Sequence, residues 1–236
     1  MGTAPRILLV VGGGIAAYKS CELVRLIRKA GGSVTCVLTE GGAQFVTAMT
    51  LAALSENKVY TSLWNLKDEA EMGHIQLSRE ADLVVVCPAT ADLMAKMAAG
   101  IADDLATTLI LATDKPVLTV PAMNVRMWLH DATQRNVERL RQAGVRVMNP
   151  DNGEMACGEY GPGRLPEPEA IWREIADSLG IVADASASGS EIEALEPEDD
   201  GENDEKMADM LSSIITRSKA AAAEGEGVPF EDLPYP

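Results

Sequence analysis

The sequence is poor in histidine, cysteine and aromatic side chains. It has two histidines and four cysteines in 236 residues, and aromatics make up 4% of the chain. No Cys-x-x-Cys pair occurs, and two histidines are too few to complete a site with the dispersed cysteines. Neither a structural zinc site nor a disulfide scaffold is therefore expected. The core must be built from aliphatic residues, as the hydrophobic content of 47% allows.

Long apolar runs and a basic surface are also lacking. No stretch approaches the ~20 apolar residues of a membrane span, and the run at 7–11 is too short for a signal-peptide core. The net charge is −16, and residues 181–236 hold 15 acidic against 3 basic residues. Nucleic-acid binding needs clustered Lys and Arg, which the chain does not offer. We therefore expect a soluble, cytoplasmic protein with no nucleic-acid or membrane partner.

Short apolar runs recur along the first 180 residues, and each is followed by a segment with helical periodicity. Such runs are typical of buried parallel strands. Strands are expected at 6–11, 33–38, 82–87, 116–120 and 145–148, and helices at 15–30, 47–54, 90–99, 104–112, 132–143 and 168–179. The alternation predicts an α/β fold, a doubly wound, mostly parallel Rossmann-like sheet with helices on both faces.

Residues 181–236 differ from the rest in composition. The stretch 191–205 is too charged and too poor in apolar residues to pack, which predicts a disordered linker. We expect one domain at 1–180 and an acidic, largely disordered tail at 181–236, with a short helix at 204–223. The apolar stripe of that helix either docks onto the body or a partner, or forms only transiently. Its short length favours the second interpretation.

A glycine-rich turn follows the first predicted strand. Residues 12–19 read Gly-Gly-Gly-Ile-Ala-Ala-Tyr-Lys, and glycine at a strand-to-helix junction lets a phosphate approach backbone N–H groups. The spacing also matches the dinucleotide fingerprint, but no acidic residue lies between Glu22 and Glu40 to hold a ribose. The turn is predicted to bind an anion, with an NAD site and a plain tight turn as alternatives.

The two histidines are the first candidates for proton transfer near neutral pH. His74 stands at the expected start of a helix that leads to the strand at 82–87, whereas His130 lies in a polar stretch. His74 is therefore the stronger candidate. A structural role is the alternative, because an isolated histidine is more often structural or solvated.

Asn124 directly follows the predicted strand at 116–120, so it should emerge at the ligand-binding edge of the sheet. Its amide can both donate to and accept from a carboxylate or amide ligand. Met123, Met127 and Trp128 would supply an apolar wall beside it. The alternative is a helix cap at Asn124 with ordinary core packing around it.

Residues 155–164 are rich in glycine and are predicted to form a flexible loop rather than a helix or strand. Cys157 lies in this loop. It is a candidate proton donor or nucleophile when the loop closes over a ligand. An inert buried cysteine is the alternative.

These segments together resemble the flavin-dependent cysteine decarboxylases, and within that family the phosphopantothenoylcysteine decarboxylase domain of coenzyme A biosynthesis. The motifs follow the family's order over residues 6–179. They are Gly13-Gly14-Ile15-Ala16-Ala17-Tyr18-Lys19, Gly73-His74-Ile75, Pro88-Ala89-Thr90-Ala91-Asp92, Gly100-x-Ala102-Asp103-Asp104-Leu105, Pro121-Ala122-Met123-Asn124-x-x-Met127-Trp128 and Ala156-Cys157-Gly158-Glu159.

The resemblance implies FMN as the cofactor, with no metal, and a mononucleotide also explains the missing ribose acid. The residues implied to bind FMN are Gly13, Gly14, Ile15, Thr39, Phe45, Thr90, Ala91, Asp92 and Ala122. By the same resemblance His74, Asn124 and Cys157 are catalytic, and Asn124 with Met127 holds the carboxylate end of the substrate.

The implied activity is the FMN-dependent decarboxylation of phosphopantothenoylcysteine to phosphopantetheine, which makes the protein a carboxy-lyase. The flavin takes hydride from the carbon that bears the thiolate, and the resulting thioaldehyde accepts the electrons released with carbon dioxide. The hydride then returns while Cys157 supplies a proton.

The resemblance also implies a homotrimer or a multiple of trimers. Many bacterial relatives carry a fused CTP-dependent synthetase, for which residues 181–236 leave no room, so a separate phosphopantothenate–cysteine ligase is expected. Two alternatives remain open. One is a peptidyl-cysteine decarboxylase of peptide-antibiotic maturation, and the other is a non-catalytic flavoprotein that regulates a protein partner through its acidic tail.

Overall fold

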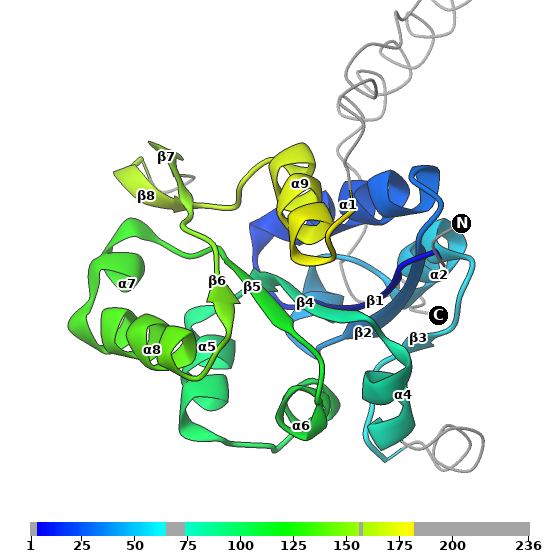
Figure 1. Ribbon diagram of the computed structural model, residues 1–236. Helices are drawn as coiled ribbons and strands as arrows, with labels where there is room; N and C mark the ends of the chain where they lie inside the picture. Colours follow the sequence, from blue (N-terminus) through cyan, green and yellow to red (C-terminus); the bar gives the residue numbers. More distant parts are fainter. Residues whose placement is uncertain (1–3, 65–73, 156–157, 182–236) are drawn as a thin grey trace, which may run out of the picture. The chain divides into compact units, whose positions relative to one another are not determined.

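A parallel six-stranded sheet forms the centre of the computed structural model, which describes residues 4–64, 74–155 and 158–181 (Figure 1). Its strands are β1 (Arg6–Val11), β2 (Ser33–Leu38), β3 (Val59–Tyr60), β4 (Leu83–Ala89), β5 (Val117–Pro121) and β6 (Arg146–Val147). The strand order is β3-β2-β1-β4-β5-β6, and every neighbouring pair is parallel. This order is that of a Rossmann-like doubly wound sheet.

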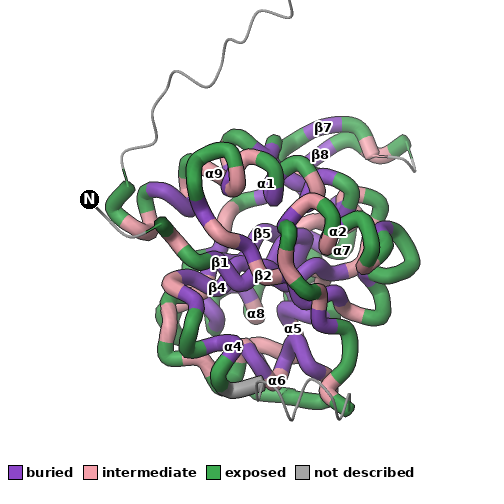
Figure 2. The backbone as a smooth tube through the Cα atoms, turned by 90° about the vertical axis from the view of Figure 1, so that its right-hand side faces the viewer, coloured by how far each residue is buried: buried purple, intermediate pink, exposed green. Residues whose placement is uncertain are grey.

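Helices cover both faces of the sheet. One face carries α1 (Tyr18–Lys29), α2 (Ala48–Ser55) and α9 (Pro168–Ser178), and the other carries α4 (His74–Glu80), α5 (Ala91–Ala99), α6 (Leu105–Ala112) and α8 (Asp131–Gln142). Successive strand residues point to opposite faces. Ile7, Leu9 and Val11 of β1 therefore join one core cluster, and Leu8 and Val10 join the other. Figure 2 shows the strands buried inside the helical layers. The predicted fold class is confirmed.

Polar side chains cap the starts of α5 and α6. Thr90 caps α5, because its hydroxyl accepts a hydrogen bond from the N–H of Leu93 at 3.1 Å. Asp104 and Thr107 form a reciprocal capping box at the start of α6. After β1 the chain makes a short 3-10 turn, Ile15–Ala17, before α1 begins. The loops after β1 and β4 therefore run directly into helix starts.

A two-stranded antiparallel hairpin lies between β6 and α9. It consists of β7 (Asp151–Glu154) and β8 (Tyr160–Arg164). The expectation of a loop throughout 155–164 was therefore wrong for β8. The physical reason is backbone contact: Gly163 accepts a hydrogen bond from the N–H of Met123 at 3.0 Å, and a side chain at 163 would lie 2.3 Å from the Met123 carbonyl oxygen. Glycine here permits strand pairing instead of preventing it.

The predicted tail at 181–236 lies almost wholly outside the described residues, so its disorder and its short helix stay predictions. Among the described helices, none combines the length and the apolar character that a bilayer crossing requires.

Candidate functional site

The loops after β1, β2 and β4 converge on one another at the carboxyl edge of the sheet. A Cβ atom on Gly12 would lie 2.3 Å from the carbonyl oxygen of Pro88, and one on Gly13 would lie 3.0 Å from the carbonyl oxygen of Gly41. This is the topological switch point, since β1 pairs with β2 on one side and β4 on the other. Ligands of doubly wound sheets bind at this position.

Thr39 fixes the relative position of the first two loops. Its hydroxyl donates to the carbonyl oxygen of Val11 at 3.0 Å and accepts from the N–H of Gly42 at 3.0 Å. Gly14 has φ 115° and ψ 157°, a conformation that is strained for any residue with a side chain. The result is a turn lined by backbone atoms, which we call the glycine cradle and define as residues 12–15 with 39–42.

A cleft of about 750 Å³ opens between the glycine cradle and the β7–β8 hairpin. Gly14, Ile15, Ala122 and Asn124, four of the candidate site residues, all line it. The other lining residues are Ala16, Tyr18, Lys19, Met123, Glu154, Met155, Gly163, Arg164 and Leu165. The segments after β1 and β5 and the hairpin therefore contribute to a single cavity of a size that suits a small organic ligand.

The other predicted cofactor residues do not line this cleft. Gly13 and Thr39 lie in the glycine cradle, whereas Thr90, Ala91 and Asp92 lie at the start of α5. The Asp92 carboxylate is 3.4 Å from the ammonium group of Lys96. Phe45 is 49% exposed and Met127, on the short helix α7 (Val125–Leu129), is 48% exposed.

The side chains of two predicted catalytic residues, His74 and Cys157, lie outside the described part of the chain. His74 is the first residue of α4, as predicted, but its side chain lies outside the described part of the chain. Cys157 lies outside the described residues altogether. His130 caps α8, because its Nδ1 accepts a hydrogen bond from the N–H of Ala132 at 3.1 Å.

Asn124 is both a helix cap and a wall of the cleft. Its Oδ1 accepts from the N–H of Arg126 at 2.8 Å, which starts α7. Its Nδ2 donates to Oε2 of Glu159 at 2.6 Å, and Nε of Arg126 donates to Oε1 of the same carboxylate at 2.6 Å. Sequence reasoning assigned no role to Arg126 or Glu159, although both lie within or beside the motifs that carry the family resemblance.

Lys19 connects the two walls of the cleft. Its side chain is 10% exposed, and its ammonium donates to the Glu167 carboxylate at 2.7 Å and to the carbonyl oxygen of Leu165 at 3.2 Å. The residue lies in the first turn of α1, whereas its partners follow β8. In the sequence, Lys19 was marked only by its position after the glycine turn. That position does not reveal the contacts of Lys19 with Leu165 and Glu167.

The described cysteines are poor nucleophiles. Burial raises the pKa of Cys36 and of Cys87 to about 12, and burial also raises the pKa of the half-buried Cys21. The thiolate is the reactive form of cysteine. At neutral pH these three thiols therefore stay protonated.

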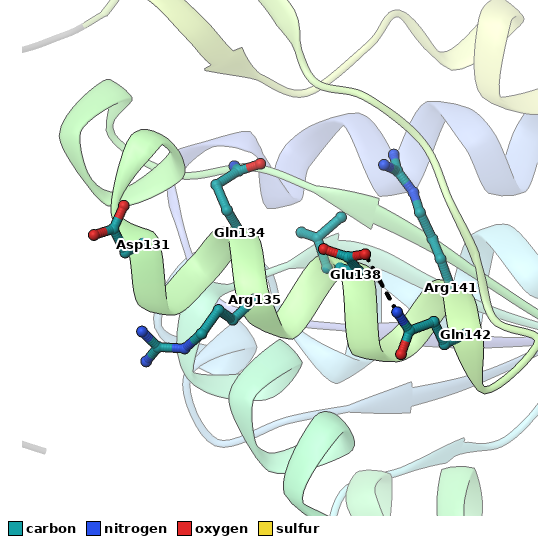
Figure 3. Close-up of a pocket in the computed structure, with 7 residues that line it drawn as sticks. Asp131, Gln134, Arg135, Glu138, Arg141 and Gln142 are labelled. Atoms are coloured by element: carbon teal, nitrogen blue, oxygen red, sulfur yellow. Dashed lines mark hydrogen bonds between the residues drawn. The ribbon is translucent and has the colours of Figure 1, made fainter.

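A second hollow, of about 810 Å³, runs along α8 (Figure 3). The residues that line it all come from that helix, and Gln142 donates to Glu138 there at 3.2 Å. They are Asp131, Gln134, Arg135, Val137, Glu138, Arg141 and Gln142. No predicted site residue is among them. Acidic and basic side chains alternate along the helix and do not converge on one point. The cleft beside the glycine cradle is therefore the better candidate.

Comparison with known proteins assigns the family. The model of the family described as "Flavoprotein" matches residues 1–180. The chain belongs to the flavoprotein family. Together with the relatives and solved structures below, this match confirms the resemblance to flavin-dependent cysteine decarboxylases.

Two solved structures illustrate the likeness. A PPC decarboxylase mutant complexed with pantothenoylaminoethenethiol is 31% identical, with a TM-score of 0.65 over 73% of this chain and 96% of that one. The FMN binding protein AtHal3 is also 31% identical, with a TM-score of 0.62 over 72% of this chain and 94% of that one.

Curated relatives of the flavoprotein are longer. The coenzyme A biosynthesis bifunctional protein CoaBC of Vibrio vulnificus strain YJ016 is 48% identical over 163 residues, which are 69% of this chain and 41% of that protein. The protein of the same name from Mycolicibacterium smegmatis is 45% identical over 208 residues, 84% of this chain and 50% of that protein. The chain thus spans half or less of the length of these relatives.

Proposed function

We propose that this flavoprotein is an FMN-dependent carboxy-lyase that converts phosphopantothenoylcysteine to phosphopantetheine in coenzyme A biosynthesis. The observation that carries the proposal is the position of Asn124, which lines the cleft beside the glycine cradle. This juxtaposition suits a substrate whose carboxylate must be held next to a bound mononucleotide. The relatives named for coenzyme A biosynthesis and for PPC decarboxylase support it.

The glycine cradle fits a flavin mononucleotide. Gly12 and Gly13 let the neighbouring backbone segments pack directly against each other, and a Cβ atom on Gly14 would meet no atom within 4 Å. A phosphate group could therefore approach the backbone N–H groups next to Gly14, just before α1. We assign Gly13, Gly14 and Ile15 to the phosphate end. The residues assigned to the rest of FMN are Thr39, Phe45, Thr90, Ala91, Asp92 and Ala122. When bound, FMN supplies reversible hydride acceptance from the carbon that bears the thiolate.

The chain's own residues would bind and orient the substrate and transfer protons. Asn124 and Met127 hold the cysteinyl carboxylate end, and His74 moves a proton near neutral pH. Cys157 donates the proton that completes the thiol product. These roles are inferred from the motifs, and the raised pKa of the three described cysteines is consistent with leaving this task to Cys157.

Self-association through the exposed apolar side chains near the glycine cradle is part of the proposal. Ile15 is 74% and Met49 81% exposed, and Tyr18 and Phe45 are also exposed. Exposed apolar side chains of this size are favourable to bury against another copy. We propose a homotrimer or a multiple of trimers, and a separate ligase that supplies the substrate. Light scattering tests the first point, because a fully active monomer would contradict it.

We further propose that residues 1–180 form the catalytic domain and that the acidic tail at 181–236 is dispensable. The tail carries a net charge of −12, so its field would oppose a substrate bearing phosphate and carboxylate groups. Truncation after Gly180 should leave kcat unchanged. A truncated protein that loses activity or its oligomeric state would contradict this domain assignment.

The decisive experiment combines cofactor identification with carbon dioxide release. Purified protein should contain FMN and release carbon dioxide from phosphopantothenoylcysteine, whereas His74→Asn should bind FMN and release none. Cys157→Ser should still release carbon dioxide but accumulate an oxidised enethiol product. A protein that contains NAD, or that binds no FMN at saturating concentration, would overturn the proposal. Release from a peptidyl-cysteine instead would favour the antibiotic-maturation alternative.

A further inference from the structure

The carboxylate of Glu159 bridges two donors beside the cleft. Asn124 Nδ2 donates to one of its oxygens at 2.6 Å, and Arg126 Nε donates to the other at 2.6 Å. Both nitrogens contact the same carboxylate group. The Arg126 guanidinium and the Asn124 amide are therefore separated only by the width of that carboxylate. A substrate carboxylate held by Asn124 would therefore lie close to the Arg126 cation and to the Glu159 carboxylate that pairs with it.

A guanidinium at this position opposes decarboxylation. Loss of carbon dioxide moves negative charge out of the carboxylate and into the remaining fragment. A cation paired with the carboxylate stabilises the reactant more than the transition state, and interactions of this kind raise the barrier. Arginine pairs with carboxylates through strong charge-assisted hydrogen bonds, whereas a neutral amide binds them more weakly. The useful ligand for this carboxylate is the amide alone.

We propose that Glu159 is a positioning residue that keeps Arg126 away from the substrate carboxylate and orients the Asn124 amide. Glu159 engages the guanidinium of Arg126, whose side chain is otherwise 86% exposed, while its own side chain is 32% exposed. The carboxylate thus cancels the cation and leaves Asn124 as the group that meets the substrate. This inference rests on the proposed decarboxylase function.

The proposal gives Glu159 a role that differs from anchoring the hairpin. Residue 159 directly precedes β8, and Arg126 and Asn124 lie in or beside α7, so the contacts also join these elements. If Glu159 only anchored the hairpin, any residue that preserves these contacts could replace it. Charge cancellation instead depends on the presence of Arg126, so removal of the arginine should make Glu159 unnecessary.

The test uses FMN-loaded, full-length protein with three variants. Glu159→Gln keeps an oxygen acceptor for Asn124 but removes the charge that cancels Arg126. The double variant Glu159→Gln with Arg126→Met removes the cation as well. Glu174→Gln is the matched control, because Glu174 is 34% exposed and pairs with Arg146 at 3.0 Å, on α9 and β6. Melting temperature and FMN content establish that each variant is folded.

In Glu159→Gln both KM and kcat for carbon dioxide release should fall about tenfold, the lower end expected for one added charge-assisted hydrogen bond to the reactant. The double variant should recover kcat, and the control should match the wild type. If kcat falls in Glu159→Gln and stays low in the double variant, Glu159 serves only to anchor the hairpin. A lower KM with unchanged kcat would show that Arg126 binds the substrate productively. Either result overturns the proposal.

A binding measurement separates this inference from the proposed activity. The probe is the substrate analogue in which serine replaces cysteine, since it keeps the carboxylate but offers no thiolate for oxidation. Its dissociation constant should fall about tenfold in Glu159→Gln and return to the wild-type value in the double variant. If wild-type protein released no carbon dioxide while this pattern held, the decarboxylase function would fail and the role of Glu159 would stand. Unchanged binding in all variants would overturn the role itself.

Discussion

Replacing Gly163 by alanine should damage the cleft while sparing the glycine cradle. Gly163 lies in β8 with φ 152°, and its carbonyl oxygen accepts from the N–H of Met123 at 3.0 Å. A Cβ atom there would lie 2.3 Å from the Met123 carbonyl oxygen and 2.9 Å from Cε of Met155. The first of these neighbours is backbone, so it cannot rotate away. The strand and the residue before Asn124 must separate.

The required displacement sets the size of the effect. Ordinary contacts begin at 3.4 Å, so the backbone has to move by about 1 Å from the 2.3 Å approach. A misplacement of this size in a binding group can cost ~10²-fold in rate. We therefore expect kcat/KM for carbon dioxide release to fall about 100-fold. FMN affinity should stay near the wild-type value, because the glycine cradle is built from the loops after β1 and β2.

The assay pairs carbon dioxide release with FMN titration and thermal unfolding. Gly144→Ala is the matched control, since Gly144 also has positive φ, 86°, but no neighbouring atom within 4 Å of the added Cβ. It should lower the free energy of unfolding by about 1 kcal/mol through backbone strain, with kcat/KM unchanged. Equal kinetic effects of the two substitutions, or near-normal kcat/KM in Gly163→Ala, would refute the steric reasoning.

Three further predictions concern stability, each checked by thermal unfolding. Lys19→Met should lower the free energy of unfolding by about 1–3 kcal/mol, because the buried Leu165 carbonyl loses its donor; an unchanged melting temperature would contradict this. Thr119→Val should raise the melting temperature by about 2–4 °C, since the buried Thr119 hydroxyl has no hydrogen-bond partner among the described residues; a decrease would mean that the hydroxyl is satisfied. Arg6 lowers the pKa of Asp82 through side-chain hydrogen bonds, so the pair stabilises the fold above about pH 4 and that contribution is lost as the pH falls through the lower folded pKa. Asp82→Asn should therefore differ most from the wild type above about pH 4, and a difference that persists in stronger acid would contradict this assignment.

The central strands could be predicted from the sequence because burial on both faces leaves an uninterrupted apolar run. All seven residues of β4 are buried. The strand predicted at 82–87 begins one residue before β4 and stops short of its end at Ala89. β3 was missed because two residues, Val59 and Tyr60, give no periodicity to detect. β7 and β8 were missed because their sequences, DNGE and YGPGR, form strands through backbone contacts rather than through apolar side chains.

The site was predictable in its local motifs and not in its long-range contacts. Strand ends marked the region of Gly14, Ile15, Ala122 and Asn124, since the carboxyl ends of parallel strands meet at one edge. The bond from Asn124 to Glu159 spans 35 positions and the bond from Lys19 to Glu167 spans 148. No spacing rule connects such residues. Their pairing depends on how the hairpin folds back over the sheet.

The β7–β8 hairpin follows the last strand of a sheet that is already complete, so it is a separable module in evolution and in engineering. It contributes Glu154, Met155, Gly163 and Arg164 to one wall of the cleft, whereas the glycine cradle supplies the opposite wall. A recombination event or a designed graft that exchanges residues 151–164 would therefore alter the choice of substrate without rebuilding the nucleotide-binding half. Such a graft would have to preserve the contact of Met123 with Gly163 and those of Asn124 and Arg126 with Glu159.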